Sequence, residues 1–225
     1  MTKWAYGNED KLARRQTILA AAARLFEESG ALPTAKEIAE AAGLAKGTVY
    51  LYFETKEEIF ATLLLNGWTS VADEIDAAWS KAAGSRQDKI DVFLRAWIGA
   101  LSERRKLLEL DALGYGMLDR NLDREISERL KHTFLQRLGQ SGALIDSAFS
   151  LVSPRGLQIL MRSYALMRGL WQSGVGIRSA DMSDHCTWSG ADPGLFDQEL
   201  YDALVEYWGG ALSRPAHFAS EAQNR

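Results

Sequence analysis

The sequence predicts an all-α protein of about nine helices, and three observations support that fold class. Apolar residues recur mainly at helical spacing, and the strict alternation that marks a half-buried strand is scarce. Only four of the 225 residues are proline, so long helices are easily accommodated. Hydrophobic residues make up 47% of the chain and charged residues 25%, which is ordinary for a globular protein with a real core.

A first helix is expected to end just before residue 30. Four apolar residues are spaced so that they share one helical face: Ile18, Ala22, Leu25 and Phe26. Ser29 and Gly30 follow directly, and glycine at this place is a typical stop signal. The sequence therefore predicts an amphipathic helix whose apolar face packs against other elements.

Two short helices are predicted next. Thr34 and Glu37 have capping-box spacing at the start of the first of them, and Gly43 ends it. The second runs over 46–53 and places Val49 and Phe53 on one face, which we expect to pack against the first helix. Its other face carries polar and aromatic side chains.

A long fourth helix follows, because Thr55 and Glu58 repeat the capping-box spacing, and it is expected to end near residues 82–85. Gly114 and Gly116 interrupt one of the later apolar stretches and predict a bent or short helix there. Five later helical segments are expected, at 90–101, 105–118, 126–138, 154–171 and 196–212. Residues 174–195 contain four glycines and are interpreted as a long loop.

We expect two domains, at residues 1–56 and 57–225. No stretch rich in proline, glycine and serine separates them, so the long fourth helix is expected to serve both mechanically. The first domain contains the short helices, and the larger second domain contains the remaining helical segments.

Charge and cysteine content set limits on location and partners. The net charge is -4 and the isoelectric point is about 5.5, so any nucleic-acid binding must depend on a local arrangement of charge. The single cysteine excludes a disulfide within the chain and fits a reducing compartment. With no apolar segment of signal-peptide or membrane-spanning length, the sequence predicts a cytoplasmic protein without membrane contact.

The two short helices, joined through Gly43, match a helix-turn-helix. In that motif the second helix enters the major groove of DNA. Gly47 lets the backbone approach DNA closely, and hydroxyl and ammonium groups beside it can bond phosphates or base edges. The alternative interpretation is an aromatic core patch in YLYF, residues 50–53, beside a solvated face of lysines.

The stretch from Arg15 to Leu64 resembles the TetR family of transcriptional regulators. The resemblance is carried by ILAAAARLFEESG, TAKEIAEAAGLAKGTVYLYF and KEEIF. It implies a three-helix DNA-binding domain, with Tyr50 and Lys56 on phosphates. The full set of expected DNA-contacting residues is Thr34, Lys36, Lys46, Gly47, Thr48, Tyr50, Leu51, Tyr52 and Lys56, of which Lys46, Gly47 and Thr48 lie nearest the bases.

Two details qualify this expected surface. Family members often have serine or threonine where this chain has Ala45, and losing such a helix cap typically costs about 1 kcal/mol. That substitution implies either a looser recognition helix or capping by another group. Arg14 and Arg15 could add positive charge near the DNA backbone.

The resemblance also implies that the second domain binds a small hydrophobic or amphipathic effector. Bulky and flexible side chains could line an apolar pocket between helices, and an inward-facing arginine would suit an anionic group. The candidates are Trp97, Tyr115, Met117, Met161, Tyr164, Arg168 and Trp171. Each of them could equally be an ordinary core residue, or, for the arginine, a solvated surface residue.

Family members act as dimers, so the resemblance implies a homodimer that binds a palindromic operator and is released by its effector. The helices at 155–173 and 196–212 would form a four-helix bundle with their symmetry mates. We expect exposed apolar contacts at Leu160, Leu200, Leu204, Tyr207 and Trp208. Repression is the family default, and the sequence leaves activation open.

An enzyme is the rival class, for instance an all-helical hydrolase or transferase that uses the second-domain pocket. The sequence predicts no catalytic residues, because His132, His185 and His217 have no recognisable triad partner. His185 and Cys186 are adjacent and lie outside any metal-ligand spacing, so we expect no metal and no cofactor. A ligand-binding protein that has lost DNA binding would be expected to lack the exposed lysine, threonine and tyrosine set.

Overall fold

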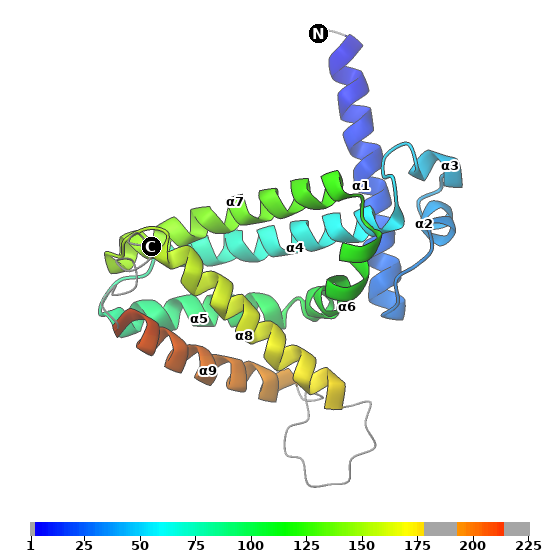
Figure 1. The fold of residues 1–225 in the computed structure, drawn as a ribbon. Coiled ribbons are helices and arrows are strands. Elements are labelled where there is room, and N and C mark those ends of the chain that lie inside the picture. The colour runs from blue at the N-terminus through cyan, green and yellow to red at the C-terminus, as the bar shows by residue number, and fades with distance from the viewer. Residues whose placement is uncertain (1–2, 178–192, 214–225) are drawn as a thin grey trace, which may run out of the picture. The chain divides into compact units, whose positions relative to one another are not determined.

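A computed structural model describes the backbone of residues 3–177 and 193–213, and the side chains in those ranges except at 3–9, 115–121, 174–177 and 193. Within the described ranges the chain forms nine α-helices and no strand, which confirms the predicted fold class (Figure 1). The helices are α1 (Lys3–Ser29), α2 (Ala35–Ala41), α3 (Lys46–Val49), α4 (Lys56–Trp79), α5 (Arg86–Ser102), α6 (Arg105–Asn121), α7 (Arg124–Phe149), α8 (Arg155–Ile177) and α9 (Pro193–Ser213).

The helices divide into two compact units. The first comprises Met1–Trp68 and Glu109–His132, and the second comprises Thr69–Leu108 and Thr133–Arg225. Three helices, α4, α6 and α7, therefore contribute residues to both units. The functional division at residue 56 stays a prediction. No helix among the described residues is both long enough and apolar enough to cross a bilayer.

The core of the first unit is built from one face of each of its helices. The predicted burial of Val49 and Phe53 is confirmed, since each side chain is 1% exposed. They pack into a cluster that also contains Ile18, Ala22 and Phe26 of α1, Ile38 of α2, Ile59 and Phe60 of α4, and Leu110 of α6. The residues of α6 were not expected in this core, because a sequence pattern does not say which distant helix covers a given face.

The capping box at the start of α2 is confirmed. Thr34 accepts a hydrogen bond from the N–H of Glu37 at 3.3 Å, and the Glu37 carboxylate accepts one from the N–H of Thr34 at 2.7 Å. The turn after α2 places Gly43 at φ 65°, a left-handed conformation that favours glycine. The two ends of α2 are therefore defined by the residues that the sequence singled out.

Acidification is expected to weaken this box. The pKa of Glu37 lies below its ordinary value because its carboxylate accepts hydrogen bonds from the backbone and hydroxyl of Thr34. Such a group stabilises the fold above its unfolded pKa of about 4.3, and the stabilisation is lost as the pH falls through the lower folded pKa. Between about pH 5 and 3, the thermal midpoint should fall more steeply for the wild type than for Glu37→Gln; parallel curves would contradict the prediction.

Several helix boundaries differ from the prediction. Helix α3 ends at Val49, four residues before Phe53, because the chain turns at Tyr50. Helix α6 continues through Gly114 and Gly116, so the expectation of a short helix is wrong, and the alternative of a bent helix stays a prediction. Glycine costs only about 1 kcal/mol inside a helix, which its flanking residues can offset. Sequence reasoning also missed a capping box at the start of α5, where Ser85 and Asp88 cap each other.

An aromatic cluster fills the second unit. Trp79, Phe93, Trp97, Phe149 and Trp208 form a continuous set of ring contacts, with the Phe93 and Trp208 centroids 4.5 Å apart. The indole N–H of Trp208 donates to the Ser163 hydroxyl at 2.9 Å. Figure 1 shows α9 running beside α5 and α8, and its apolar face is buried against both.

This packing corrects the expectation that a set of apolar residues on α8 and α9 is exposed. Leu160 is 7% exposed, and the side chains of Leu200, Leu204 and Trp208 are fully buried within one chain. Tyr207 is half-buried. The physical reason is that α9 turns its apolar face onto α5 and α8 of its own chain, so these side chains belong to the core.

Helices α7 and α8 approach each other at two glycines. A Cβ atom at Gly156 would lie 2.1 Å from the carbonyl oxygen of Gly142, and one at Gly142 would lie 2.7 Å from the backbone nitrogen of Leu157. Asp146 accepts a hydrogen bond from the N–H of Gly156 at 2.5 Å. The backbones can therefore pack this closely only while both positions lack a side chain.

The Gly156→Ala variant is expected to be less stable by about 1–3 kcal/mol, because the methyl group meets backbone atoms that cannot rotate away. Gly139→Ala is the matched control on the facing helix α7, since a Cβ atom there would meet no atom within 4 Å. The control should be more stable by up to about 1 kcal/mol. Chemical unfolding checks both, and equal effects of the two substitutions would contradict the close packing.

Candidate DNA-binding surface

The segment of α3 and the turn after it divides into a buried side and an exposed side. Val49 and Phe53 lie in the core, whereas Tyr50 is 46% exposed and Leu51 is 76% exposed. Lys46 and Gly47 are also exposed, and the space around Gly47 is open. The exposed side of this segment is therefore accessible to another molecule.

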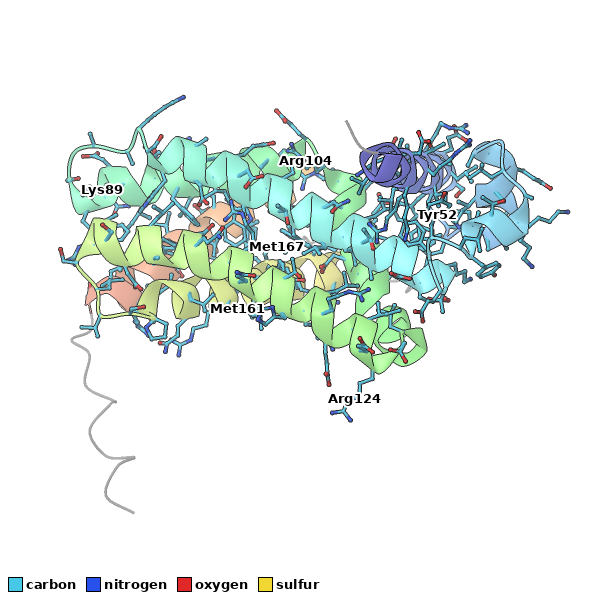
Figure 2. The ribbon with its side chains drawn as sticks, turned by 90° about the horizontal axis from the view of Figure 1, so that it is seen from above. Tyr52, Lys89, Arg104, Arg124, Met161 and Met167 are labelled. Atoms are coloured by element: carbon cyan, nitrogen blue, oxygen red, sulfur yellow. The ribbon has the colours of Figure 1, made fainter. Side chains whose placement is uncertain are left out.

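Two of the expected contact residues are less accessible. Thr48 and Tyr52 are half-buried, and Tyr52 packs against the core of the first unit. Figure 2 labels Tyr52 among the side chains of this unit. Tyr52 therefore stabilises the segment by packing against the core. A role in contacting DNA stays a prediction for both Thr48 and Tyr52.

The N-terminus of α3 has no side-chain cap. Ala45 precedes the helix in an extended conformation and makes no side-chain hydrogen bond to it, as its residue type predicted. The first backbone N–H groups of a helix need acceptors from outside the helix, and a phosphate oxygen is a suitable one. The Ala45 side chain supplies no such acceptor, so a phosphate contact at this helix start stays a prediction.

The three lysines at the starts of α2, α3 and α4 each lie near one side chain close in sequence. Lys36 lies 3.7 Å from Glu40 on the same exposed face of α2, and Lys56 lies 4.0 Å from Glu57. The ammonium group of Lys46 lies 6.0 Å from the ring centroid of Tyr50. The Lys36–Glu40 pair is exposed, and exposed ion pairs contribute about 0–1 kcal/mol, so a phosphate can replace that carboxylate at little cost.

Thr34 is exposed, but its hydroxyl group is already used within the chain. It donates to the Glu37 carboxylate at 2.8 Å while it accepts the N–H of Glu37. Contact with a phosphate through this hydroxyl would require the capping box to rearrange. The placement of Thr34 in the DNA-contacting set stays a prediction.

Arg15 contacts other residues of the first unit, and its contribution of charge near the DNA backbone stays a prediction. It is half-buried, with its guanidinium carbon 4.4 Å from the ring centroid of Phe53 and one nitrogen 4.0 Å from the buried Glu58 carboxylate. The same nitrogen lies 3.4 Å from the Thr62 hydroxyl. Arg14, by contrast, is exposed.

The structure brings together two of the residues proposed for a ligand pocket, Tyr164 and Arg168, and the pocket itself stays a prediction. Trp97 belongs to the aromatic core and is 4% exposed. Tyr164 contacts Phe134, and the Arg168 guanidinium carbon lies 5.5 Å from the Tyr164 ring centroid. Met161 is half-buried, at the place that Figure 2 labels. The side chains of Tyr115 and Met117 lie outside the described residues, as do His185 and Cys186.

The sequence did not predict a cluster of polar contacts that joins the start of α6 to the start of α9. Arg105 at the start of α6 lies 2.5 Å from the Asp197 carboxylate near the start of α9, and Ser102 donates to the same oxygen at 2.7 Å. The Arg105 guanidinium also lies over the ring of Phe196, which contacts Trp171 of α8. No sequence pattern connects residues that are more than ninety positions apart.

Comparison with known proteins assigns both parts of the chain. Residues 18–63 match the family model described as "Bacterial regulatory proteins, tetR family", and residues 65–175 match that described as "Tetracyclin repressor-like, C-terminal domain". The uncharacterized HTH-type transcriptional regulator YfiR of Bacillus subtilis (strain 168) is 40% identical over 60 residues, which are 26% of this chain. The match spans only 29% of that relative's length.

Solved structures share the fold along most of the chain. A protein from Mesorhizobium loti MAFF303099 that is assigned to the TetR family has a TM-score of 0.60 at 17% identity, over 89% of this chain and 97% of its own. The transcriptional regulator FadR from Bacillus subtilis, in complex with stearoyl-CoA, has a TM-score of 0.52 at 16% identity, over 85% of this chain and 98% of its own. These likenesses concern the fold.

Proposed function

This chain belongs to the TetR family of bacterial regulatory proteins, which are DNA-binding transcriptional regulators, and on that premise we propose that it is a ligand-responsive repressor. It would bind a palindromic operator as a homodimer and be released by a small amphipathic effector. The observation that carries the DNA-binding part is the exposure of Tyr50 and Leu51 beside the buried Val49 and Phe53.

The proposed DNA contacts follow from chemistry at the exposed side. Lys46, Tyr50 and Lys56 can reach phosphate oxygens through ammonium or phenol groups, which position the protein on the duplex. Gly47 lets the α3 backbone approach base edges, and Leu51 is suited to apolar contact with a thymine methyl group. Two such surfaces would be held about 34 Å apart, so that they fit successive turns of one groove.

The proposed dimer uses the outward faces of α8 and α9, because their apolar inward faces are used within the chain. Ala165 and Gly169 on α8, and Gly209 and Gly210 on α9, are exposed and small. Small residues allow helices of two subunits to approach closely. These residues replace the buried leucines and Trp208 as the proposed contact surface.

The proposed effector has an apolar body and an anionic group. The second unit contains bulky aromatic and methionine side chains, and Arg168 lies among them on α8 beside Tyr164. A regulator of the same fold was solved with stearoyl-CoA, which makes a long-chain acyl-CoA the first effector to test. Such a ligand can release DNA only through its preference for the DNA-incompatible state, and a coupling of about 1–3 kcal/mol would weaken binding about 5- to 150-fold.

The experiment has two stages. The purified chain is first used to select duplexes from a random library, and we expect an inverted repeat that the protein shifts as a dimer. Stearoyl-CoA is then added to the complex, with free stearate and free coenzyme A as controls. Release of the selected duplex by stearoyl-CoA alone supports the effector class. Failure to select any duplex contradicts DNA binding, whereas stabilisation of the protein without DNA release contradicts an inducer role.

A further inference from the structure

Glu58 is a buried carboxylate at the start of α4. Its residue is 5% exposed, and its N–H donates to the Thr55 hydroxyl at 3.1 Å. One carboxylate oxygen accepts the backbone N–H of Glu54 at 2.8 Å. Glu58 therefore caps the first turn of α4 and holds the backbone at Glu54 in place. Glu54 directly follows residues 46–53, which are called the recognition segment below.

The other carboxylate oxygen of Glu58 lies between two arginines from distant helices. The Arg15 guanidinium on α1 is 4.0 Å away, and the Arg129 guanidinium on α7 is 3.6 Å away. A buried carboxylate is costly when a cationic partner is removed, because its remaining charge is then poorly compensated. The position of Glu58 is therefore sensitive to where both α1 and α7 hold their guanidinium groups.

The contacts continue to the recognition segment. Arg15 lies over the ring of Phe53, and Phe53 anchors the turn that carries the exposed Tyr50 and Leu51. Arg129, Glu58, Arg15 and Phe53 thus form one series of contacts within the first unit. Helix α7 begins in this unit and continues through residue 149 into the second unit.

We infer that Arg129 is a positioning residue, which couples α7 to the recognition segment through Glu58 and Arg15. The inference rests on the DNA binding proposed above. It adds a route, through α7, by which an effector bound to the second unit would change DNA binding. Coupling of this kind is reciprocal. DNA bound at the recognition segment must therefore change the stability of the first turns of α7, although α7 is not proposed to touch DNA.

Hydrogen exchange tests this prediction without an identified effector. The full-length protein is measured with and without a duplex selected on the wild type. In the wild type, DNA should slow amide exchange at residues 46–53 and also, by about fivefold or more, at residues 124–132. In Arg129→Met, the slowing at 46–53 should persist while that at 124–132 is lost. Arg129→Gln is the second variant and should behave in the same way.

Arg124→Met is the matched control. Arg124 lies on the same helix, its side chain is 91% exposed, and it pairs with Glu128 one turn away; Figure 2 shows it pointing away from the ribbon. This variant should keep the wild-type response at 124–132. The inference is overturned if DNA leaves 124–132 unchanged in the wild type, or if the Arg129 variants respond as the wild type does. If no duplex protects 46–53, the proposed function fails first and the inference falls with it.

Discussion

Replacing Tyr50 and Lys56 together by alanine is expected to abolish operator binding in a standard shift assay. Each residue is proposed to donate a hydrogen bond to a phosphate, and a hydrogen bond to a charged group contributes about 1.5–3 kcal/mol. Losing two of them lowers the affinity by about 100-fold or more. Neither side chain belongs to the core, since Tyr50 is 46% exposed and the Lys56 side chain 36%, so the helical fold should persist.

The measurement is a titration of the selected duplex at several salt concentrations. The slope of log affinity against log salt should become shallower by about 0.9 for each Lys56 that no longer neutralises a phosphate, because the loss of the uncharged Tyr50 contact releases no counterion. Lys81→Ala is the control, because it removes an equal charge from an exposed position of the second unit. Wild-type affinity in the double variant, with unchanged circular dichroism, would show that the recognition face has been assigned to the wrong residues.

Trp208→Ala is expected to destabilise the fold by about 3–5 kcal/mol. Its ring is fully buried, lies 4.5 Å from Phe93 and 6.2 Å from Phe149 between centroids, and its N–H satisfies the buried Ser163 hydroxyl. Truncation would leave a large cavity in the aromatic cluster of the second unit. Chemical unfolding monitored by circular dichroism measures the loss.

The same substitution separates a core role from a dimer role. A residue of the dimer surface would, when truncated, leave the stability of the monomer unchanged and shift the dissociation constant of the dimer. Trp208→Phe is the graded control, because it keeps most of the ring volume and loses the hydrogen bond to Ser163, so the cost should be about 1 kcal/mol. Near wild-type stability for Trp208→Ala, together with dissociated subunits, would contradict the core assignment.

Local signals in the sequence predicted local structure well. The capping-box spacing of Thr34 and Glu37 and the turn at Gly43 define α2, and the spacing of Val49 and Phe53 predicts which side of the recognition segment is buried. These features depend on residues within about one helical turn of each other, which the sequence displays directly. The family resemblance added the expectation that the opposite, exposed side of this segment contacts DNA.

Long-range partners could not be predicted in the same way. An apolar face on α9 indicates burial, but its pattern is the same whether Leu200 and Leu204 face a neighbouring helix or a second subunit. Charge is equally ambiguous. Arginine is a residue type that often contacts phosphates, yet Arg15 lies against Glu58 and Phe53. Only the packing of distant helices decides these cases.

The contribution of α6 to the core of the first unit limits how this regulator can be rebuilt. Leu110 is 5% exposed within that core, and Leu122 packs against it. A chimaera that grafts residues 1–68 onto a foreign sensor would leave an uncovered apolar patch on the transplanted module. Modular exchange must therefore carry residues 109–132 along with the helix-turn-helix, so the transferable part of this chain is discontinuous in sequence.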